Sequence, residues 1–355
     1  MMKNKKYIPY LVLILLLYGF LIFANRTFDP YKIRILNLCF VYVVLAISLN
    51  IINGFAGLFS LGHAGFMALG AYTSAILTMT PAGKAATYYM IPITPILANV
   101  QLSFPLALLV AGAVTAFFGF LIGFPVLKLR DDYLAIASLG FAEILRVVFN
   151  NTYTITNGSL GLNGIPIHTT LLVSATVAVI VIFLTARLMQ SSFGRAIKSV
   201  RDDEIAAEAM GIDLFKTKLL AFVVGSFFAG VGGAMLGNLI GTIDPNLFKF
   251  TLTFNILLIV VLGGMGSISG SVIAAVIVTV MMESLRFLDE SFSFMGYRIS
   301  GVQGLRMVIF SILLMIVVIF YREGLMGKNE LSMAYIKDKI NRLKNKGKKT
   351  RKEVG

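Results

Sequence analysis

Apolar segments of about 20 residues follow one another almost end to end along this chain of 355 residues. In helical form, a segment of that length spans the hydrocarbon core of a bilayer. Hydrophobic residues make up 57% of the chain and charged residues only 14%. A soluble domain carries about a quarter of its residues as charged ones. The pattern therefore predicts an all-α, polytopic membrane protein and excludes a soluble enzyme, a disordered protein and a nucleic-acid-binding module.

The apolar pattern predicts about ten membrane-spanning helices, of which the eighth is the shortest. Their approximate ranges are 7–24, 35–52, 62–80, 102–124, 133–150, 169–186, 219–241, 250–264, 268–287 and 300–320. We expect residues 1–320 to form one transmembrane domain and residues 321–355 to form a basic tail.

The distribution of Lys and Arg predicts the orientation of these spans. The formal net charge is +14. Most Lys and Arg lie before the first span, in the loop 187–218 and from Arg322 onward. All three places fall on one side of the predicted topology, and loops rich in Lys and Arg face the cytoplasm. Both termini are therefore expected to be cytoplasmic.

Residues for metal binding or catalysis are scarce. The one cysteine, Cys39, excludes an intrachain disulfide, and the two histidines, His63 and His168, lie far apart in the sequence. No G-x-x-x-x-G-K-[ST] phosphate loop is present. We therefore expect no enzymatic activity in this chain, no metal site and no cofactor.

The segment Gly54–Tyr72 is rich in glycine and interrupts a helical pattern. Non-helical backbone at membrane depth persists only where it is buried in protein or faces water. The segment is therefore a candidate for the lining of a polar path, with close helix packing as the open alternative. Its candidate path residues are Gly57, Ser60, Gly62, His63 and Gly65.

A second segment, Asn255–Ala275, has the same order of features as Asn50–Ala71. Each runs from Asn through an apolar stretch and a Gly/Ser-rich break to a helix of small residues. Transporters are often built from repeats whose broken helices flank the substrate path. The match is loose, and the sequence leaves open whether it is a true repeat. The candidate path residues in this segment are Asn255, Gly264 and Ser267.

Two ionisable residues interrupt the fifth span. Glu143 and Arg146 are three residues apart and therefore share a helix face. The sequence leaves two interpretations open: a mutual salt bridge, and a role in the path. The stretch 156–162 after this span falls outside the cell in the predicted topology, where it suits an outer gate or a partner surface.

The inside loop 187–218 resembles a soluble helical stretch. Asp202, Asp203 and Glu204 suit the first turn of a helix, and Gly211 suits its end. We predict that this loop docks a partner protein; a connector lying on the bilayer surface is the alternative.

Four stretches carry a family resemblance: GLFSLGHAGFMALGAY, FGRAIKSVRDDEIAAEAMGI, KLLAFVVGSFFAGVGGAM and VVLGGMGSISGSV. In this order they resemble the permease subunits of branched-chain amino acid ABC importers, the LivM type, over about residues 35–320. The resemblance implies an ABC importer permease fold in the bacterial cytoplasmic membrane. It also implies alternating access driven by separate ATPase subunits.

The resemblance implies a set of partners as well. These are two cytosolic ATP-binding cassette subunits, a second homologous permease of the LivH type, an extracytoplasmic protein that delivers Leu, Ile or Val, and the lipid bilayer; no nucleic acid is implied. The residues that match the family's ATPase-docking loop are Gly194, Arg195, Arg201, Glu204, Glu208 and Gly211.

Other functions remain open from the sequence. A urea or short-amide ABC permease shares most of these motifs, and a sugar or nucleoside permease shares fewer. An ATP-independent secondary transporter fits the composition but predicts intramembrane carboxylates for ion coupling, for which only Glu143 is a clear candidate. A membrane-embedded enzyme fits least, since no paired carboxylates or metal cluster appear in the sequence.

Overall fold

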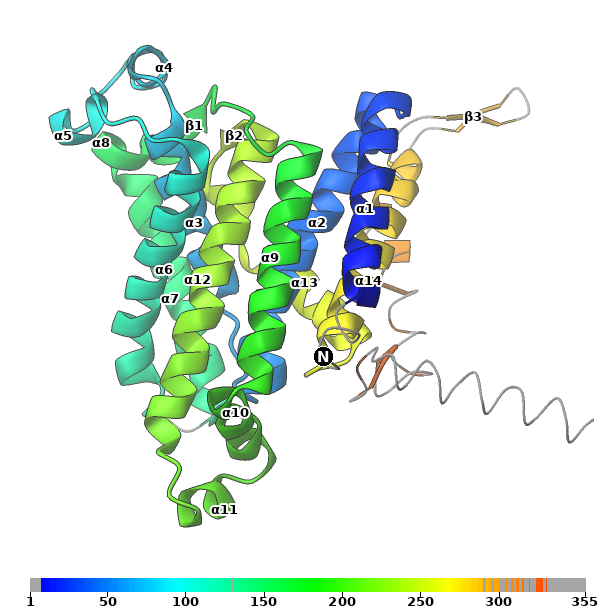
Figure 1. Cartoon of the computed structure of the whole chain (residues 1–355). Coiled ribbons are helices and arrows are strands. Elements are labelled where there is room, and N and C mark those ends of the chain that lie inside the picture. The colour runs from blue at the N-terminus through cyan, green and yellow to red at the C-terminus, as the bar shows by residue number, and fades with distance from the viewer. Residues whose placement is uncertain are drawn as a thin grey trace, which may run out of the picture.

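The computed structural model describes residues 8–128 and 131–289, and short stretches or single positions between 292 and 330. This part of the chain is a bundle of long helices with two very short antiparallel strand pairs (Figure 1). The prediction of an all-α polytopic protein is confirmed. Most of the predicted tenth span, most of the basic tail and the N-terminal residues 1–7 lie outside the described residues.

The long helices follow the predicted spans. They are α1 (Ile8–Thr27), α2 (Pro30–Leu49) continued by the π-helix η2 (Asn50–Phe55), α3 (His63–Thr78), α6 (Phe104–Val126), α7 (Asp131–Asn151), α9 (Leu171–Gln190), α12 (Leu214–Ile240), α13 (Phe250–Gly263) and α14 (Ile268–Ser284). Each predicted span from 7–24 to 268–287 overlaps one of them. Among the described residues, 5 helices are long and apolar enough to cross a membrane: Pro30–Phe55, Phe104–Val126, Tyr133–Asn151, Leu171–Gln190 and Leu214–Ile240.

Short elements lie at the two ends of the bundle (Figure 1). One end carries α4 (Pro81–Thr87), α5 (Pro95–Ala98), α8 (Tyr153–Thr156), η3 (Gly158–Leu160), η4 (Pro245–Phe248) and the pair β1 (Leu162–Asn163) with β2 (Thr242–Ile243). The opposite end carries α10 (Ser192–Asp202) and α11 (Glu204–Ala209). After α14 come η5 (Leu285–Leu288) and the hairpin of β3 (Phe292–Phe294) and β4 (Tyr297–Ile299).

Polar side chains mark where the helices begin. A side-chain oxygen of the residue before the helix accepts a backbone N–H from the first turn, which satisfies a donor that has no partner within the helix. This occurs at Thr80, Ser191, Asp203, Asp213 and Ser267. The N–H of Lys216 lowers the pKa of the Asp213 carboxyl because the hydrogen bond favours the ionised form. The α12 helix ends at Gly241, whose φ of 80° suits glycine.

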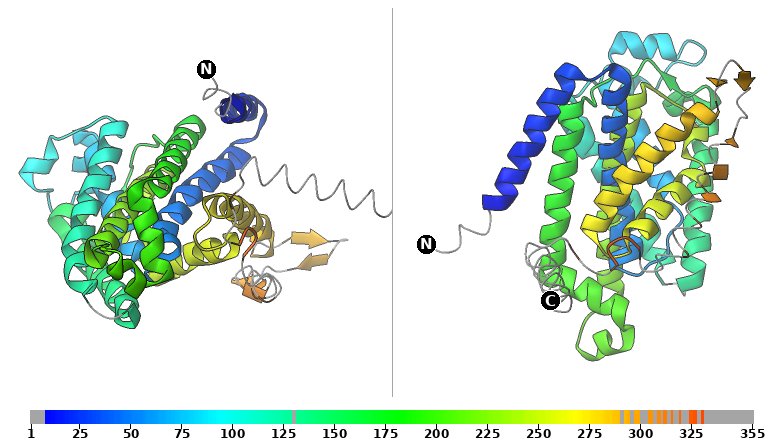
Figure 2. Two further views of the ribbon diagram at one scale, coloured as in Figure 1. Left: turned by 60° about the horizontal axis from the view of Figure 1, so that its bottom comes forward. Right: turned by 90° about the vertical axis from the view of Figure 1, so that its right-hand side faces the viewer.

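The core is built around α12, which packs against α2, α3 and α6 (Figures 1 and 2). Glycines bring these helices into backbone contact. A Cβ at Gly70 of α3 would lie 2.1 Å from the carbonyl oxygen of Gly230, and one at Gly233 would lie 2.1 Å from that of Met67. Lipid supplies no hydrophobic drive between helices, so close packing of small residues holds the bundle together.

The first helix packs on the outside of this core. In Figure 2, α1 lies beside α9 and away from α12. Leu21 and Ala24 of α1 form a small apolar cluster with Leu171 and Ala175 of α9. The α1 helix is therefore a peripheral element that covers one face of the bundle.

The end with α4 and α8 is tied together by hydrogen bonds to backbone carbonyls. Lys84 is buried, and its Nζ donates to the carbonyls of Leu97 at 2.7 Å and Val100 at 2.5 Å. Burial lowers the pKa of Lys84 because desolvation disfavours the charged form. The Tyr88 hydroxyl donates to the carbonyl of Ile155. These bonds join α4, α5 and α8 into one cap.

The glycine contacts predict a stability difference between two identical substitutions. Gly70→Ala places a methyl against the backbone of α12 and should cost about 1–3 kcal/mol, as overpacked cores do. Gly140→Ala on α7 is the control, because a Cβ there meets nothing within 4 Å. Alanine's higher helix propensity should stabilise that variant by up to about 1 kcal/mol. Thermal unfolding of both variants in detergent measures the difference, and equal midpoints would contradict the packing argument.

Candidate functional site

The first Gly-rich break joins η2 to α3 and leaves helical geometry near the α10 end of the bundle. Gly57 has a φ of 71°, which L-residues rarely adopt. The amide of Asn53 pairs with the backbone of Ser60, donating from Nδ2 to its carbonyl (3.4 Å) and accepting its N–H (3.3 Å). A side chain thus replaces the hydrogen bonds that the broken helix lacks.

The second break, between α13 and α14, contacts the first one directly. It contains Gly264 with φ 107° and Gly266 with φ 84°. A Cβ at Gly54 would lie 2.4 Å from the nitrogen of Gly266. The two segments that share a sequence pattern therefore meet at their breaks.

Asn50 is the residue that joins the two breaks. Its side chain is fully buried, and its Oδ1 accepts the N–H of Gly266 at 2.8 Å. Its Nδ2 donates to the carbonyl of Ser267 at 2.9 Å and to Oγ of Ser271 at 2.8 Å. The sequence analysis selected Asn255, the residue at the corresponding place in the second segment. Asn255 is half-buried on α13 and makes no hydrogen bond with any described residue.

His63 and Ser60 carry unpartnered polar atoms beside the first break. Oγ of Ser48 donates to the carbonyl of Leu45 at 2.7 Å, so it accepts from Nε2 of His63 at 2.9 Å. This tautomer leaves Nδ1 of His63 as an acceptor. Neither that atom nor Oγ of Ser60 has a partner among the described residues, and both side chains are 1% exposed. Buried polar atoms without partners are rare, and they mark where water or a solute can bind.

The glycines at the start of α3 pack against α7. A Cβ at Gly62 would lie 2.5 Å from the carbonyl oxygen of Ser138, and one at Gly65 would lie 2.9 Å from Cα of Ala142. In addition, the N–H of Leu61 donates to Oγ of Ser138 at 3.0 Å. In this conformation Gly62 and Gly65 therefore pack closely against a neighbouring helix, which is the alternative to lining a path that the sequence left open.

Glu143 and Arg146 form the salt bridge that their spacing suggests. Nε and Nη2 of Arg146 lie 2.8 and 2.7 Å from Oε2 of Glu143. The Glu143 side chain is 41% exposed, so the pair lies on the flank of α7.

The loop 187–218 projects from one end of the bundle as α10 and α11 (Figure 1). Gly194 is buried in the tight turn from α9, and Gly211, with φ 80°, ends α11. The helix end predicted at Gly211 is confirmed. Glu204 bonds Lys218 of α12 at 2.5 Å, while Glu208 is exposed.

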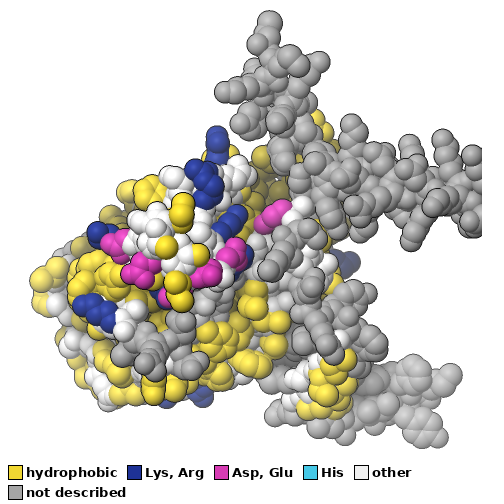
Figure 3. All heavy atoms as spheres, turned by 90° about the horizontal axis from the view of Figure 1, so that it is seen from below, with side chains coloured by type: hydrophobic (Ala, Val, Ile, Leu, Met, Phe, Trp, Pro, Cys, Tyr) yellow, Lys and Arg dark blue, Asp and Glu magenta, His cyan; other side chains and the backbone are white. Residues whose placement is uncertain are grey.

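The α11 helix presents apolar side chains to the surroundings. Ile205 is 83% exposed and Met210 is 82% exposed. Figure 3 shows hydrophobic side chains on this end of the molecule, surrounded by acidic and basic ones. Ile205, Glu208 and Met210 are called the α11 patch below. The sequence analysis missed its two apolar members, although an exposed helix with isolated large apolar residues is the signal for a contact surface.

Part of the chain after the predicted tenth span packs on the second break. Backbone N–H groups of Leu325 and Met326 donate to the carbonyls of Leu262 and Gly263 at the end of α13. The carboxylate of Glu330 accepts the N–H groups of Ile268 (2.7 Å) and Ser269 (3.1 Å) at the start of α14. These contacts satisfy backbone groups that the break leaves without helical partners.

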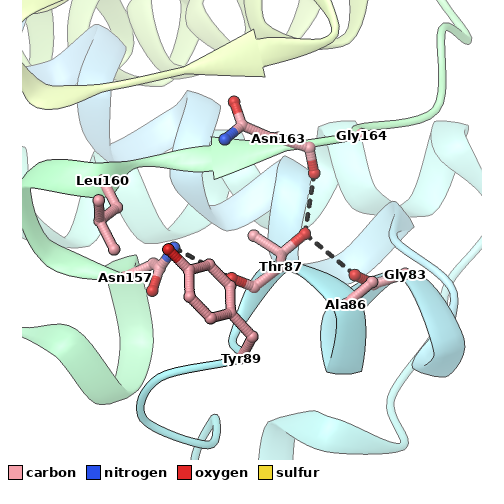
Figure 4. Close-up of a pocket in the computed structure, with 8 residues that line it drawn as sticks. All are labelled: Gly83, Ala86, Thr87, Tyr89, Asn157, Leu160, Asn163 and Gly164. Carbon is pink, nitrogen blue, oxygen red and sulfur yellow. Dashed lines mark hydrogen bonds between the residues drawn. The ribbon is translucent and has the colours of Figure 1, made fainter.

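A pocket of about 360 Å³ lies at the opposite end, in the cap (Figure 4). Its lining residues are Gly83, Ala86, Thr87, Tyr89, Asn157, Leu160, Asn163 and Gly164. Thr87 donates to the carbonyls of Gly83 and Asn163, and Asn157 donates to the carbonyl of Thr87 (Figure 4). The stretch 156–162, expected on the outside, thus forms one wall of this pocket.

Comparison with known proteins assigns this chain to a family. The profile of the family described as branched-chain amino acid transport system / permease component matches residues 31–319. That range includes both breaks, α10, α11 and the cap. The chain belongs to this permease family. The family resemblance of the four sequence stretches is thereby confirmed, and the protein is a multi-pass membrane permease.

Three relatives show how far the similarity extends. The high-affinity branched-chain amino acid transport system permease protein LivM of Salmonella typhimurium is 33% identical over 322 residues, 81% of this chain and 70% of the relative. The probable permease protein LivM of Methanocaldococcus jannaschii is 25% identical over 84% of this chain and 94% of the relative. The LivH permease of Salmonella typhimurium is 35% identical over 97 residues, 27% of this chain and 31% of the relative. No solved structure matches this permease.

The clamp between the two breaks predicts that Asn50 is essential for the stability of this permease. Asn50→Leu leaves the part-buried N–H of Gly266 without its acceptor and removes the amide donor to the carbonyl of Ser267 and Oγ of Ser271. A donor left unsatisfied in this way costs about 1–3 kcal/mol. The matched control is Asn255→Leu, which removes an amide that bonds no described residue. Thermal unfolding in detergent should show a much lower midpoint for the Asn50 variant only. A similar loss in both variants would contradict the clamp.

Proposed function

We propose that this chain is the LivM-type permease subunit of an ATP-binding cassette importer that carries Leu, Ile and Val across the bacterial cytoplasmic membrane. Two separate cytosolic ATPase subunits supply the energy, a LivH-type permease completes the membrane part, and an extracytoplasmic binding protein delivers the substrate. The observation that carries the proposal is the α10–α11 lobe, which projects from the bundle and also contacts its two helix breaks.

The exposed α11 patch supports docking of an ATPase subunit. Large apolar side chains surrounded by charges are typical of a protein contact surface. The excess of Lys and Arg in this loop and near both termini supports a cytoplasmic position for the lobe. Glu204 links α11 to Lys218 of α12, so a force applied to the patch reaches the central helix of the bundle.

The two breaks support a substrate path at this end of the bundle. A zwitterionic amino acid needs partners for both of its charges, which backbone N–H and C=O groups at broken helices supply. Oγ of Ser60 and Nδ1 of His63 are the unpartnered polar atoms nearest in sequence to the first break. We propose that Gly57, Gly264 and Ser267 line the path when the breaks separate. In the conformation described here, Asn50 holds them together.

Transport then follows alternating access. ATP binding brings the ATPase subunits together, the α10–α11 lobe moves with them, and the bundle opens towards the binding protein at the cap. Hydrolysis reverses the movement and releases the substrate to the cytoplasm. The hydrogen-bonded cap around Lys84 and the pocket beside it form the surface that the binding protein meets.

A secondary transporter is less well supported. Its ion coupling needs an intramembrane carboxylate that changes partners, and Glu143 is bonded to Arg146 on the flank of α7. A urea or short-amide importer shares the fold and differs in the solute that the binding protein captures.

The test of this proposal is a purification from native membranes followed by uptake. The tagged chain should retain two ATPase subunits and a second permease. Proteoliposomes with this complex and its binding protein should take up labelled leucine in an ATP-dependent manner, with isoleucine and valine as competitors. Uptake without ATPase subunits would support a secondary transporter, and competition by urea or acetamide but not by valine would support the amide importer.

The α11 patch predicts a specific loss of assembly. Ile205→Asp places a charge in the proposed apolar contact and should release the ATPase subunits, measured by the amount that co-purifies with the tagged permease. The matched control is Ile96→Asp, because Ile96 is 80% exposed at the opposite end of the bundle. This control should retain the ATPase subunits. Equal retention in both variants would remove α11 from the docking surface.

A further inference from the structure

The two arginines of α10 point in different directions. Arg195 is exposed, and its Nη1 bonds the carbonyl of Gln190 at 3.1 Å. The Arg201 side chain is only 24% exposed and runs back towards the bundle. The sequence analysis placed both residues on the ATPase-docking surface. The position of Arg201 fits a different role.

Arg201 contacts both helix breaks at once. Its Nη1 donates to the carbonyl of Gly54 at 3.2 Å. A Cβ at Gly57 would lie only 2.9 Å from Cγ of Arg201. The same Nη1 lies 2.7 Å from the Cβ position of Gly266 in the second break. Glycine at positions 57 and 266 leaves the space that the guanidinium and its stem occupy.

The rest of the guanidinium is held by the neighbouring carboxylate. Nε and Nη2 of Arg201 donate to Oδ1 of Asp202 at 3.0 and 2.7 Å. This fork fixes the orientation of the planar group and leaves Nη1 free to point at Gly54. A lysine ammonium is a single point charge and cannot hold both partners in this geometry.

A second cation of α10 supports the connection. Nζ of Lys198 lies 5.5 Å from the centre of the Phe55 ring, at the end of η2. Ile197 and Val200 are buried beneath the same helix. The α10 helix is therefore joined to the first break by side chains along one face.

We propose that Arg201 is a positioning residue that transmits movement of the ATPase subunits from α10 to both breaks, and that it does not itself bind the ATPase. The proposal rests on the proposed function. Displacement of α10 pulls the guanidinium away from Gly54 and Gly266, which frees the breaks to separate around the Asn50 clamp. In this proposal α11 docks the ATPase subunit, and the inward face of α10 transmits the movement of that subunit to the breaks.

The test uses a thiol label at the second break. Met265 is 51% exposed between the two glycines of that break, and Cys39 is the one native cysteine. The complete complex with both ATPase subunits, carrying Cys39→Ala and Met265→Cys, is placed in lipid nanodiscs. The rate of maleimide labelling is measured without nucleotide and in the state trapped with ADP and vanadate. The rate should differ between the two states when Arg201 is present.

Arg201→Gln should retain the ATPase subunits and their basal hydrolysis but label at the same rate in both states. The amount of leucine transported per ATP should fall about tenfold, within the range typical of coupling between distant sites. Arg201→Lys should recover part of the labelling difference because its ammonium still reaches a carbonyl. Arg195→Gln is the matched control on the same helix and should keep the full difference.

A second variant tests the same contact with Arg201 intact. Gly57→Ala drives a methyl against the arginine stem and should abolish the labelling difference. Gly164→Ala is its control for backbone strain, because Gly164 also has a φ of 71° and a Cβ there meets nothing within 4 Å. This pair decides the question if Arg201→Gln fails to fold.

Each remaining outcome overturns the proposal. A full labelling difference in Arg201→Gln, or in Gly57→Ala, shows that the breaks respond without Arg201. Loss of the ATPase subunits from Arg201→Gln makes Arg201 a docking residue. Failure of the Arg201-containing complex to bind any ATPase subunit overturns the proposed function, and the inference falls with it.

Discussion

The amide of Asn50 is the interaction on which the arrangement of this permease depends. Lipid offers no hydrogen bonds, so backbone groups exposed by a broken helix must find partners inside the protein. Two breaks lie in contact here, and one side chain accepts the N–H of Gly266 and also donates to the carbonyl of Ser267. The clamp consists only of the hydrogen bonds of Asn50 to a glycine-rich segment. It therefore stabilises one conformation while both segments stay non-helical at their breaks.

The bundle around this clamp is held by backbone contact. Gly70, Gly230 and Gly233 let α3 and α12 approach until only glycine fits, whereas Gly140 on the flank of α7 has open space. The sequence shows that the chain is rich in glycine, but it does not show which glycines contact another helix. The pattern of small residues is similar on helix faces that pack against a neighbour and on faces that have open space. Span positions follow directly from hydropathy, and the helices α1 to α14 confirm those within the described residues.

The site was only partly predictable. Glycine breaks, the salt bridge on α7 and the end of α11 depend on residues close in sequence, so the sequence reveals them. Asn50 and Arg201 act on partners more than 140 residues away, as the separations of 216 and 147 residues show. No local pattern distinguishes Asn50 from Asn255, or Arg201 from Arg195. Only the fold shows which member of each pair points into the protein.

The two ends of the bundle differ in how they are joined to it, and this difference indicates which end moves. In the cap, Lys84, Thr87 and Tyr88 donate to backbone carbonyls of separate segments, which ties those segments into one unit. At the opposite end, α10 buries Ile197 and Val200 against the bundle, but it reaches the first break through the ends of long cationic side chains that lie over glycine and an aromatic ring. Such contacts can be broken and remade without unfolding a helix. In the proposed mechanism, a driving force is therefore best applied at α10, so that the breaks separate before the cap loosens.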